Sequence, residues 1–280
     1  EYFLQDQVYL FGDRLSVLAG ARFSRTEAYS TNKRTNTTQL RIDESWNPRY
    51  GLVWLPQSAA SIYLNFSQLS SALLFTNPDG RRFSPTVAEL AESGVRFEVL
   101  DRRLFLTASL YQLRNTGTLV PDPGRPDYFI ATGEQRTRGL EFDFVGKPAK
   151  NWQMVGSANV ADAFFSRHTG EFQGNRRINT PSHTYSLWNR YDVTHGALHG
   201  TWIGIGFLRL SGRYGDAANS FYIPPYYRVD VSVGYQASRW DVALMIKNVS
   251  DQNYIRATSS ELSVYPGSPR EYSFRLRLRF

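Results

Sequence analysis

The segment Tyr272–Phe280 alternates apolar and polar side chains without exception, and no other feature constrains the fold of this chain as strongly. A period of two residues predicts a β-strand, whose two faces need opposite surroundings. An arginine that faces lipid near the bilayer midplane would cost roughly 2–4 kcal/mol. If the strand crosses a membrane, its aromatic and leucine side chains therefore face lipid, and Arg275, Arg277 and Arg279 face water. A soluble β-sandwich could show the same alternation, so both classes stay open at this point.

Other segments repeat this alternation, namely Leu104–Leu110, Leu140–Phe144, Arg228–Tyr235 and Trp240–Lys247. The segment Tyr185–Asp192 is less regular, and the sequence does not assign its faces. The whole pattern predicts about 13 strands of roughly 10–13 residues, the length that a membrane-crossing β-strand needs.

Short and long connections alternate between these strands. The short ones lie at 11–14, 100–103, 147–151, 193–196 and 237–239. The long ones are rich in Gly, Asn, Pro and Arg and lie at 27–42, 68–90, 114–133, 164–181, 214–225 and 250–269. A transmembrane β-barrel has this asymmetry, with short periplasmic turns and long extracellular loops. We therefore predict an all-β, antiparallel up-and-down transmembrane barrel, here as a partial barrel.

Composition excludes several other classes. No run of about 18 apolar residues is present, which excludes a membrane-spanning helix. The chain has no cysteine, so disulfides, thiolate metal sites and cysteine nucleophiles are excluded. Aromatic residues reach 15%, which suits the girdles of a membrane barrel. The chain opens at Glu1 without a signal segment, and single-chain bacterial barrels have even strand numbers, so we expect a mature or partial chain.

The net charge of +7 could indicate a nucleic-acid groove or a trap for anionic ligands. The six long connections together carry only roughly +1, so the basic excess lies mostly in strands and short turns. For Arg275, Arg277 and Arg279 we favour a hydrated inner wall over a polyanion groove. We therefore predict no nucleic-acid partner.

Several motifs occur in the order found in one known family. The segments that carry the resemblance are Leu4–Gln7, Asn47–Val53, Gly133–Glu141 (GEQRTRGLE), Pro224–Asp230 and Asn248–Tyr254. Together they resemble TonB-dependent siderophore receptors of the bacterial outer membrane, and the likeness covers nearly the whole chain. Ser93 departs from the pattern, because the family usually has a hydrophobic residue there. Phe280 resembles the signal that the barrel-assembly machinery recognises.

The resemblance implies that residues 1–280 are the C-terminal portion of a receptor barrel of about 22 strands. The N-terminal plug, the TonB box and the first strands would lie outside this chain. The inner arginines could then contact carboxylates of the plug.

The implied function is the uptake of a ferric siderophore by a non-enzymatic transporter. TonB, ExbB and ExbD would act through the plug and TonB box, and outer-membrane lipid and lipopolysaccharide would surround the barrel. The iron belongs to the ligand, so we expect no cofactor or metal site in the protein. Three alternatives stay open: another cargo such as haem, cobalamin or a glycan, a passive porin-like channel, and a soluble all-β binding module.

Ligand contacts are expected from aromatic and basic side chains near the outer ends of the strands. The predicted binding group comprises Tyr128, Phe129, Phe165, Arg176, Arg177, Tyr222, Tyr254 and Arg256. No Ser/His/Asp set or carboxylate pair suggests catalysis. His195 and His199 are four residues apart, but they flank Gly196 in a predicted turn and not on a helix. His168 and His183 are the positions that a haem cargo would require.

Overall fold

The protein, in a computed structural model, is described at residues 1–33, 36–73, 83–122, 125–168 and 172–279. All the regular structure of these residues is β-strand, and Phe280 lies outside them. No helix in the described part of the chain is long and apolar enough to cross a membrane. The strands are β1 (Tyr2–Leu10), β2 (Leu15–Asn32), β3 (Thr37–Gln57), β4 (Ala60–Ser71), β5 (Thr86–Val99), β6 (Leu104–Asp122), β7 (Arg125–Ala149), β8 (Trp152–Arg167), β9 (His183–Asp192), β10 (Thr201–Leu210), β11 (Arg213–Tyr214), β12 (Tyr222–Ile223), β13 (Tyr226–Gln236), β14 (Trp240–Lys247), β15 (Ile255–Ser260), β16 (Ser263–Pro266) and β17 (Glu271–Leu278).

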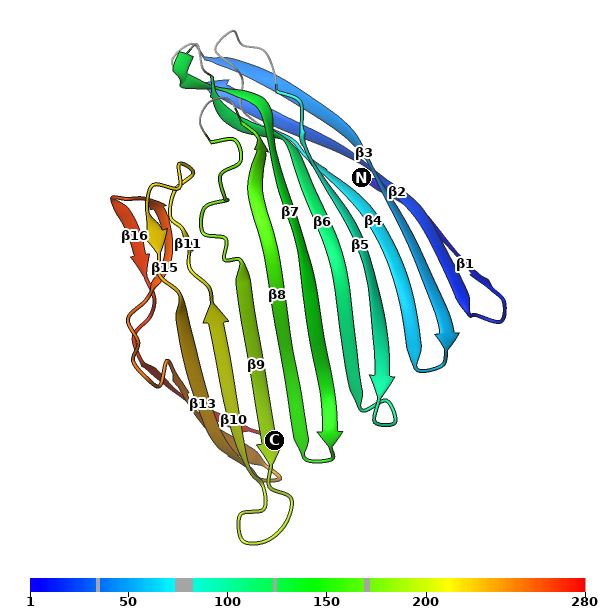
Figure 1. Ribbon diagram of the computed structural model, residues 1–280, viewed down its shortest axis with the longest axis vertical. Coiled ribbons are helices and arrows are strands. Elements are labelled where there is room, and N and C mark those ends of the chain that lie inside the picture. Colours follow the sequence, from blue (N-terminus) through cyan, green and yellow to red (C-terminus); the bar gives the residue numbers. More distant parts are fainter. Residues whose placement is uncertain (34–35, 74–82, 123–124, 169–171, 280) are drawn as a thin grey trace. The chain divides into compact units, whose positions relative to one another are not determined.

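Thirteen strands form one sheet in chain order, β1 to β10 followed by β13, β14 and β17 (Figure 1). The other four strands form two short hairpins, β11–β12 and β15–β16. Consecutive strands pair antiparallel, as the registers of β1–β2 and β13–β14 show. The predicted strand number and up-and-down order are therefore confirmed.

The predicted strand lengths are wrong for several strands. β7 has 25 residues and β3 has 21, against an expectation of 10–13. The segments 27–42 and 114–133, predicted as loops, lie mostly in strands. The reason is that polar pairs extend the hairpins beyond their apolar part: Arg25 lies opposite Glu44, and the hydroxyls of Thr31 and Thr38 are 3.0 Å apart. A polar composition resembles a loop, but a partner strand can still complete the backbone hydrogen bonds.

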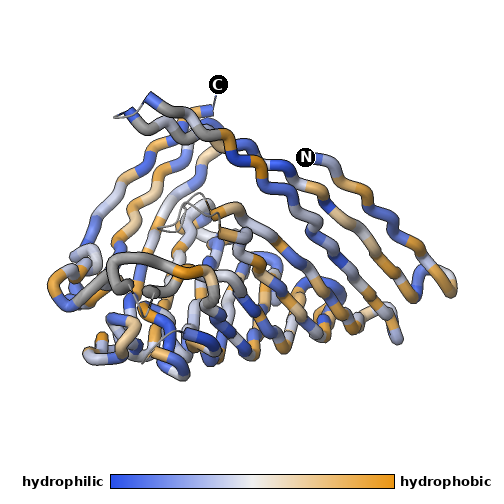
Figure 2. The backbone as a smooth tube through the Cα atoms, turned by 90° about the horizontal axis from the view of Figure 1, so that it is seen from above, coloured by the Kyte–Doolittle hydropathy of each residue, from blue (hydrophilic) through white to orange (hydrophobic). Residues whose placement is uncertain are grey.

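The chain divides into two compact units. Unit 1 comprises residues 1–94, 110–138 and 163–175, and unit 2 comprises residues 95–109, 139–162 and 176–280. Along several strands hydrophilic and hydrophobic residues alternate, as Figure 2 shows. The register then decides what each face of a unit carries.

In unit 1 the register separates an apolar face from a polar face. One row across β1 to β4 is Val8, Val17, Leu52 and Leu64. On the other face a neighbouring row is Gln5, Gly20, Arg49 and Ser67. Gln7 and Ser16 also lie on the polar face, where the amide nitrogen donates to the hydroxyl at 2.8 Å.

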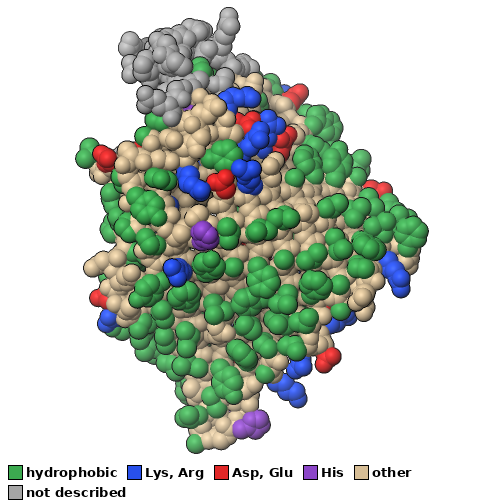
Figure 3. Space-filling model, in the orientation of Figure 1, with side chains coloured by type: hydrophobic (Ala, Val, Ile, Leu, Met, Phe, Trp, Pro, Cys, Tyr) green, Lys and Arg blue, Asp and Glu red, His purple; other side chains and the backbone are tan. Residues whose placement is uncertain are grey.

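In unit 2 the same separation holds. The apolar face of β10 and β13 carries Ile203, Ile205, Phe207, Val229, Val231 and Val233. Leu244 and Phe274 continue this face on β14 and β17. Hydrophobic side chains cover much of the sheet in the space-filling view (Figure 3).

The strand β9 shows why the sequence did not assign its faces. Trp188 points to the polar face, where it lies over Gly204 and Gly206 of β10: a Cβ at either glycine would approach its ring to 2.7 Å. Asn189 points to the apolar face, where its side-chain oxygen accepts a hydrogen bond from Trp152 Nε1 at 3.3 Å. The apolar Trp188 thus lies on the polar face, and the polar Asn189 lies on the apolar face. Their contacts with the neighbouring strands β10 and β8 explain this arrangement.

The arginines of β17 lie on the polar face, as the lipid argument predicts. The carboxylate of Asp241 in β14 is largely buried and lies 2.9 Å from Arg279 and 4.0 Å from each of Arg275 and Arg277. Three guanidinium groups therefore share one carboxylate. Their side chains remain about half exposed, which agrees with an inner wall that contacts water.

Candidate functional site

Three long connections of unit 2 are joined at the end of the sheet opposite its short turns. Asn179 follows β8, and Thr258 lies between β14 and β17. The Asn179 amide nitrogen donates to the Thr258 carbonyl at 2.7 Å, and its oxygen accepts from the Thr258 backbone N–H at 3.0 Å. The Thr258 hydroxyl donates to the carbonyl of Gly215, between β10 and β13, at 2.6 Å. We call these contacts the Asn179–Thr258 clasp.

Arg213 in β11 strengthens this junction. Its side chain is almost fully buried, and Nη2 donates to the carbonyls of Ile255 and Arg256 at 2.9 and 2.8 Å. Burial lowers the pKa of Arg213 below its ordinary value, because the charged form loses water, while the nearby Tyr226 phenol acts in the opposite direction. Nη1 is buried and has no partner among the described residues.

Beside this arginine two tyrosines stack. The rings of Tyr226 and Tyr254 lie 4.3 Å apart at an interplanar angle of 22°. The guanidinium of Arg213 lies 5.7 Å from the Tyr226 ring centre. Arg228 pairs with Asp230 at 3.0 Å, and its guanidinium interacts with the Tyr254 phenol. We call Arg213, Tyr226, Arg228 and Tyr254 the Arg/Tyr cluster.

The position of Tyr254 depends on the turn that follows β14. Asn248 is fully buried, its backbone N–H donates to Asp230 at 2.9 Å, and its side chain donates to the carbonyls of Gln252 and Ser268. Gly267 packs against the Tyr254 ring, where a Cβ would approach to 2.1 Å. This turn therefore holds the phenol at the outer end of the polar face, because Arg228 and Asp230 lie on that face of β13.

Of the predicted binding residues, Tyr254 lies in the Arg/Tyr cluster and four others lie in the long connections of unit 2. Tyr222 packs edge-on against Tyr214 with ring centres 5.8 Å apart. Arg256 has an exposed side chain, while its carbonyl accepts from Arg213. Arg176 pairs with Asp162 at 3.2 Å, and Arg177 follows it in the same connection.

The other three predicted residues lie in unit 1. Phe165 is buried at the end of β8 and packs edge-on against His168, which in turn contacts Phe172 at 5.0 Å. Tyr128 and Phe129 belong to β7, but their side chains lie outside the described residues.

Sequence reasoning missed three members of the cluster, Arg213, Tyr226 and Arg228. Arg228 and Asp230 alternate with valines in a predicted strand, which indicated an inner face but not a site. Nothing in the local sequence indicates that Arg213 is buried, because its partners are about 40 residues away.

No group of three or more His, Cys, Asp or Glu side chains that could hold a metal ion occurs within the described residues. His183 contacts the neighbouring Ser182 hydroxyl at 2.9 Å through Nδ1. His195 contacts Thr194 in the same way.

Comparison with known proteins decides the family. A family model described as "TonB dependent receptor-like, beta-barrel" matches residues 1–249. The chain belongs to this family. TonB-dependent receptors are outer-membrane transporters and receptors of Gram-negative bacteria, so the apolar faces meet lipid and the polar faces line the barrel interior. The predicted transmembrane barrel and its outer-membrane location are confirmed.

Individual relatives of the chain are also named as receptors. The chain is 29% identical over 283 residues to the ferrichrome outer membrane transporter/phage receptor of Escherichia coli, covering 99% of this chain and 38% of that protein. It is 28% identical over 285 residues to the metal-pseudopaline receptor CntO of Pseudomonas aeruginosa, covering 99% and 40%. In fold it matches the siderophore receptor PiuA of Acinetobacter baumannii with a TM-score of 0.85 at 22% identity, covering 98% and 42%. The chain thus spans about two fifths of the length of the curated relatives it matches.

Proposed function

We propose that the receptor containing this chain takes up a ferric siderophore across the outer membrane by TonB-dependent active transport, without enzymatic activity. The Arg/Tyr cluster carries this proposal: Arg213 and Tyr226 are buried, and beside them the partly exposed Tyr254 and Arg228 lie at the outer end of the barrel's inner face. Relatives over nearly the whole chain are receptors for ferrichrome and for metal-pseudopaline.

The chemistry of the cluster suits a bulky metal chelate. Aromatic faces offer apolar area with little loss of conformational entropy, and arginines favour the oxygen-rich, often anionic shell of such a ligand. Selectivity then comes from shape and polar contacts, and no covalent step is needed. TonB would rearrange a plug outside this chain to release the chelate, and the iron would remain bound to the siderophore throughout.

The test uses the full-length receptor in a host without other siderophore receptors. We expect uptake of ferrichrome or metal-loaded pseudopaline labelled with radioactive metal. Tyr254→Ala should weaken binding about fivefold or more, because an aromatic contact contributes roughly 1 kcal/mol beyond its buried area. Tyr254→Phe should retain most of the affinity, because the ring remains.

Tyr227→Ala is the matched control, because Tyr227 is the neighbour of Tyr226 on β13 and faces lipid. If Tyr227→Ala weakens uptake as much as Tyr254→Ala, the cluster does not bind the ligand. Growth only on haem, cobalamin or a glycan would indicate another cargo. Steady ion conductance without TonB would indicate a passive channel.

The relative CntO supports a second candidate function, the uptake of chelates of several different metals. Because that relative is named for metal-pseudopaline, this receptor could carry chelates of metals other than iron. Uptake assays with the same chelator loaded with iron, nickel or zinc would separate the two.

A further inference from the structure

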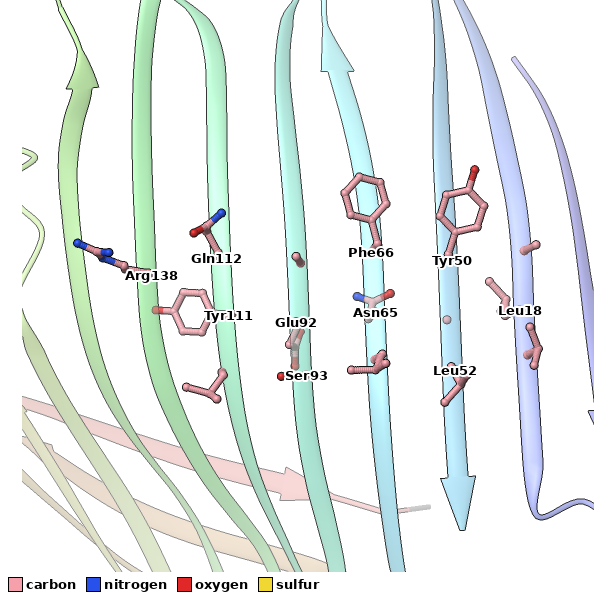
Figure 4. A pocket seen from close by; sticks show the side chains of 16 residues that line it. Leu18, Tyr50, Leu52, Asn65, Phe66, Glu92, Ser93, Tyr111, Gln112 and Arg138 are labelled. Carbon is pink, nitrogen blue, oxygen red and sulfur yellow. The ribbon is translucent and has the colours of Figure 1, made fainter. Parts of the chain in front are cut away.

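Two arginines are buried among the described residues, Arg41 in unit 1 and Arg213 in unit 2. Arg41 pairs with the carboxylate of Asp43, which compensates its charge. Other arginines stay accessible at the surface, such as Arg138, which lines a hollow of about 710 Å³ in unit 1 (Figure 4). Arg213 is only 2% exposed, and within the described chain no carboxylate pairs with it. Buried charges in proteins are normally paired, so the burial of Arg213 needs another explanation.

The partners of Arg213 are two successive backbone carbonyls of a different connection. Its Nη2 alone donates to the carbonyls of Ile255 and Arg256, at 2.9 and 2.8 Å. These two residues begin β15, which lies close to β11 at the outer end of unit 2 (Figure 1). Arg213 itself is held in β11 by pairing with the fully buried Ile223 of β12. A fixed guanidinium therefore holds the backbone of the connection between β14 and β17.

This contact fixes the direction of the Arg256 side chain. The carbonyl of Ile255 belongs to the peptide plane before the Arg256 Cα, and the carbonyl of Arg256 belongs to the plane after it. Because peptide planes are rigid, holding both carbonyls limits rotation on either side of that Cα and sets where its Cβ points. The Arg256 side chain is exposed, so its guanidinium is available to a ligand.

The same contact completes the support of Tyr254. Before this residue, Gln252 is held by Asn248, whose side chain bonds to its backbone N–H and carbonyl at 3.0 Å each. The Tyr254 carbonyl accepts from the Gly267 N–H at 2.8 Å. Asn248 and Gly267 belong to the same connection as Tyr254, whereas Arg213 comes from the connection between β10 and β13. Arg213 thus ties the Tyr254 segment to a separate part of unit 2.

We infer that Arg213 is a positioning residue of the ligand site, which sets the spacing between the Tyr254 phenol and the Arg256 guanidinium. It is too deeply buried to touch the ligand itself. Two contacts that are already in place lose less conformational entropy on binding than two mobile ones, so Arg213 raises the affinity through them. This role rests on the proposed siderophore function, but the position of Tyr254 can be tested without a ligand.

Hydrogen–deuterium exchange of the full-length receptor without ligand tests the support of Tyr254. Arg213→Met removes both carbonyl bonds and keeps a long apolar side chain. The Gly267 amide, which bonds to the Tyr254 carbonyl, should then exchange about tenfold faster than in the wild type. Arg213→Lys should exchange almost like the wild type, because one nitrogen makes both carbonyl bonds. Unchanged exchange at Gly267 in Arg213→Met overturns the inference, whether or not a siderophore binds.

Equilibrium binding of ferrichrome and of iron-loaded pseudopaline to the same receptor tests the action through the two side chains. Arg213→Met should weaken binding of whichever chelate the wild type takes up about fivefold, and Arg213→Lys should restore most of it. In a receptor that already carries Tyr254→Ala and Arg256→Gln, adding Arg213→Met should change the affinity by less than about twofold, because the residues it positions are gone.

Arg41→Met removes the other buried arginine and is the matched control. Whatever its effect on affinity, that effect should add to those of Tyr254→Ala and Arg256→Gln. If the effect of Arg213→Met adds in the same way, Arg213 only stabilises the receptor and the inference is wrong. If the wild type binds neither chelate, the proposed function is contradicted, and exchange at Gly267 still decides whether Arg213 holds Tyr254.

Discussion

At the scale of single residues, close packing on the inner face explains why particular residue types occur at particular positions, which composition alone does not. Gly204 and Gly206 of β10 leave room for the Trp188 indole, which a Cβ at either position would contact at 2.7 Å. Ser232 fills the space on the other side, 2.5 Å from a Cβ at Gly204. A glycine inside a strand normally weakens the strand. At Gly204 the close approach of the Trp188 and Ser232 side chains explains why a glycine is present.

Gly204→Val should therefore destabilise the barrel by about 1–3 kcal/mol, because a branched side chain overlaps the indole and the Ser232 hydroxyl. Ile203→Val, one residue away on the lipid face, should change stability by less than about 1 kcal/mol. Guanidinium unfolding of the receptor in phospholipid vesicles measures both. Equal stability of Gly204→Val and the wild type would contradict the packing described for Trp188.

At the scale of elements, side chains join connections that are far apart in the sequence. The Asn179–Thr258 clasp joins residues 79 positions apart, and Arg213 reaches over 42 residues to Ile255. Both ends of the clasp are at least half-buried, so each bond replaces water that has been excluded. The long connections of unit 2 thus form one ordered structure that supports Tyr254.

Asn179→Ala should remove the clasp and make the connection around Thr258 locally more mobile. The Thr258 backbone N–H loses its acceptor in a buried place, which costs about 1–3 kcal/mol. Hydrogen–deuterium exchange should then be faster at residues 255–258 than in the wild type, with little change in β13 and β14. Ser263→Ala, which removes an exposed bond to Tyr265, is the control and should leave exchange at 255–258 unchanged. Unchanged exchange in Asn179→Ala would mean that the clasp does not hold the connections.

At the scale of the whole molecule, the membrane decides which face may carry charge. The apolar rows of β10, β13, β14 and β17 meet lipid, while Asp230, Asp241 and the arginines of β17 lie on the inner face. No single strand needs to be hydrophobic overall, which is why the mean hydropathy of −0.41 resembles that of a soluble protein.

Two adjacent residues of β14 test this assignment. Leu244 faces lipid near the middle of its strand, and Met245 faces the interior. Leu244→Arg should destabilise the receptor in a bilayer by about 2–4 kcal/mol. Met245→Arg should cost distinctly less, because its charge can reach water. Unfolding in vesicles of defined thickness gives both values, and a larger loss for Met245→Arg would reverse the two faces.

The sequence by itself determined the all-β class, the strand number, the two faces of the regularly alternating strands, and the family. These follow from a period of two and from ordered motifs, which are local signals that each strand carries independently of its neighbours. The unbroken alternation of Tyr272–Phe280 already placed the β17 arginines on the inner face.

Only the tertiary structure decided the rest, because it depends on partners distant in the chain. Polar segments of β2, β3, β6 and β7 became strand because a neighbour completed their backbone hydrogen bonds. Trp188 points inward because β10 has glycines opposite it, and Arg213 lies against Tyr226 because the connection between β14 and β17 supplies its carbonyl partners. The Arg/Tyr cluster is assembled from β11, β13 and the connection that follows β14, and no local pattern in one strand encodes that arrangement.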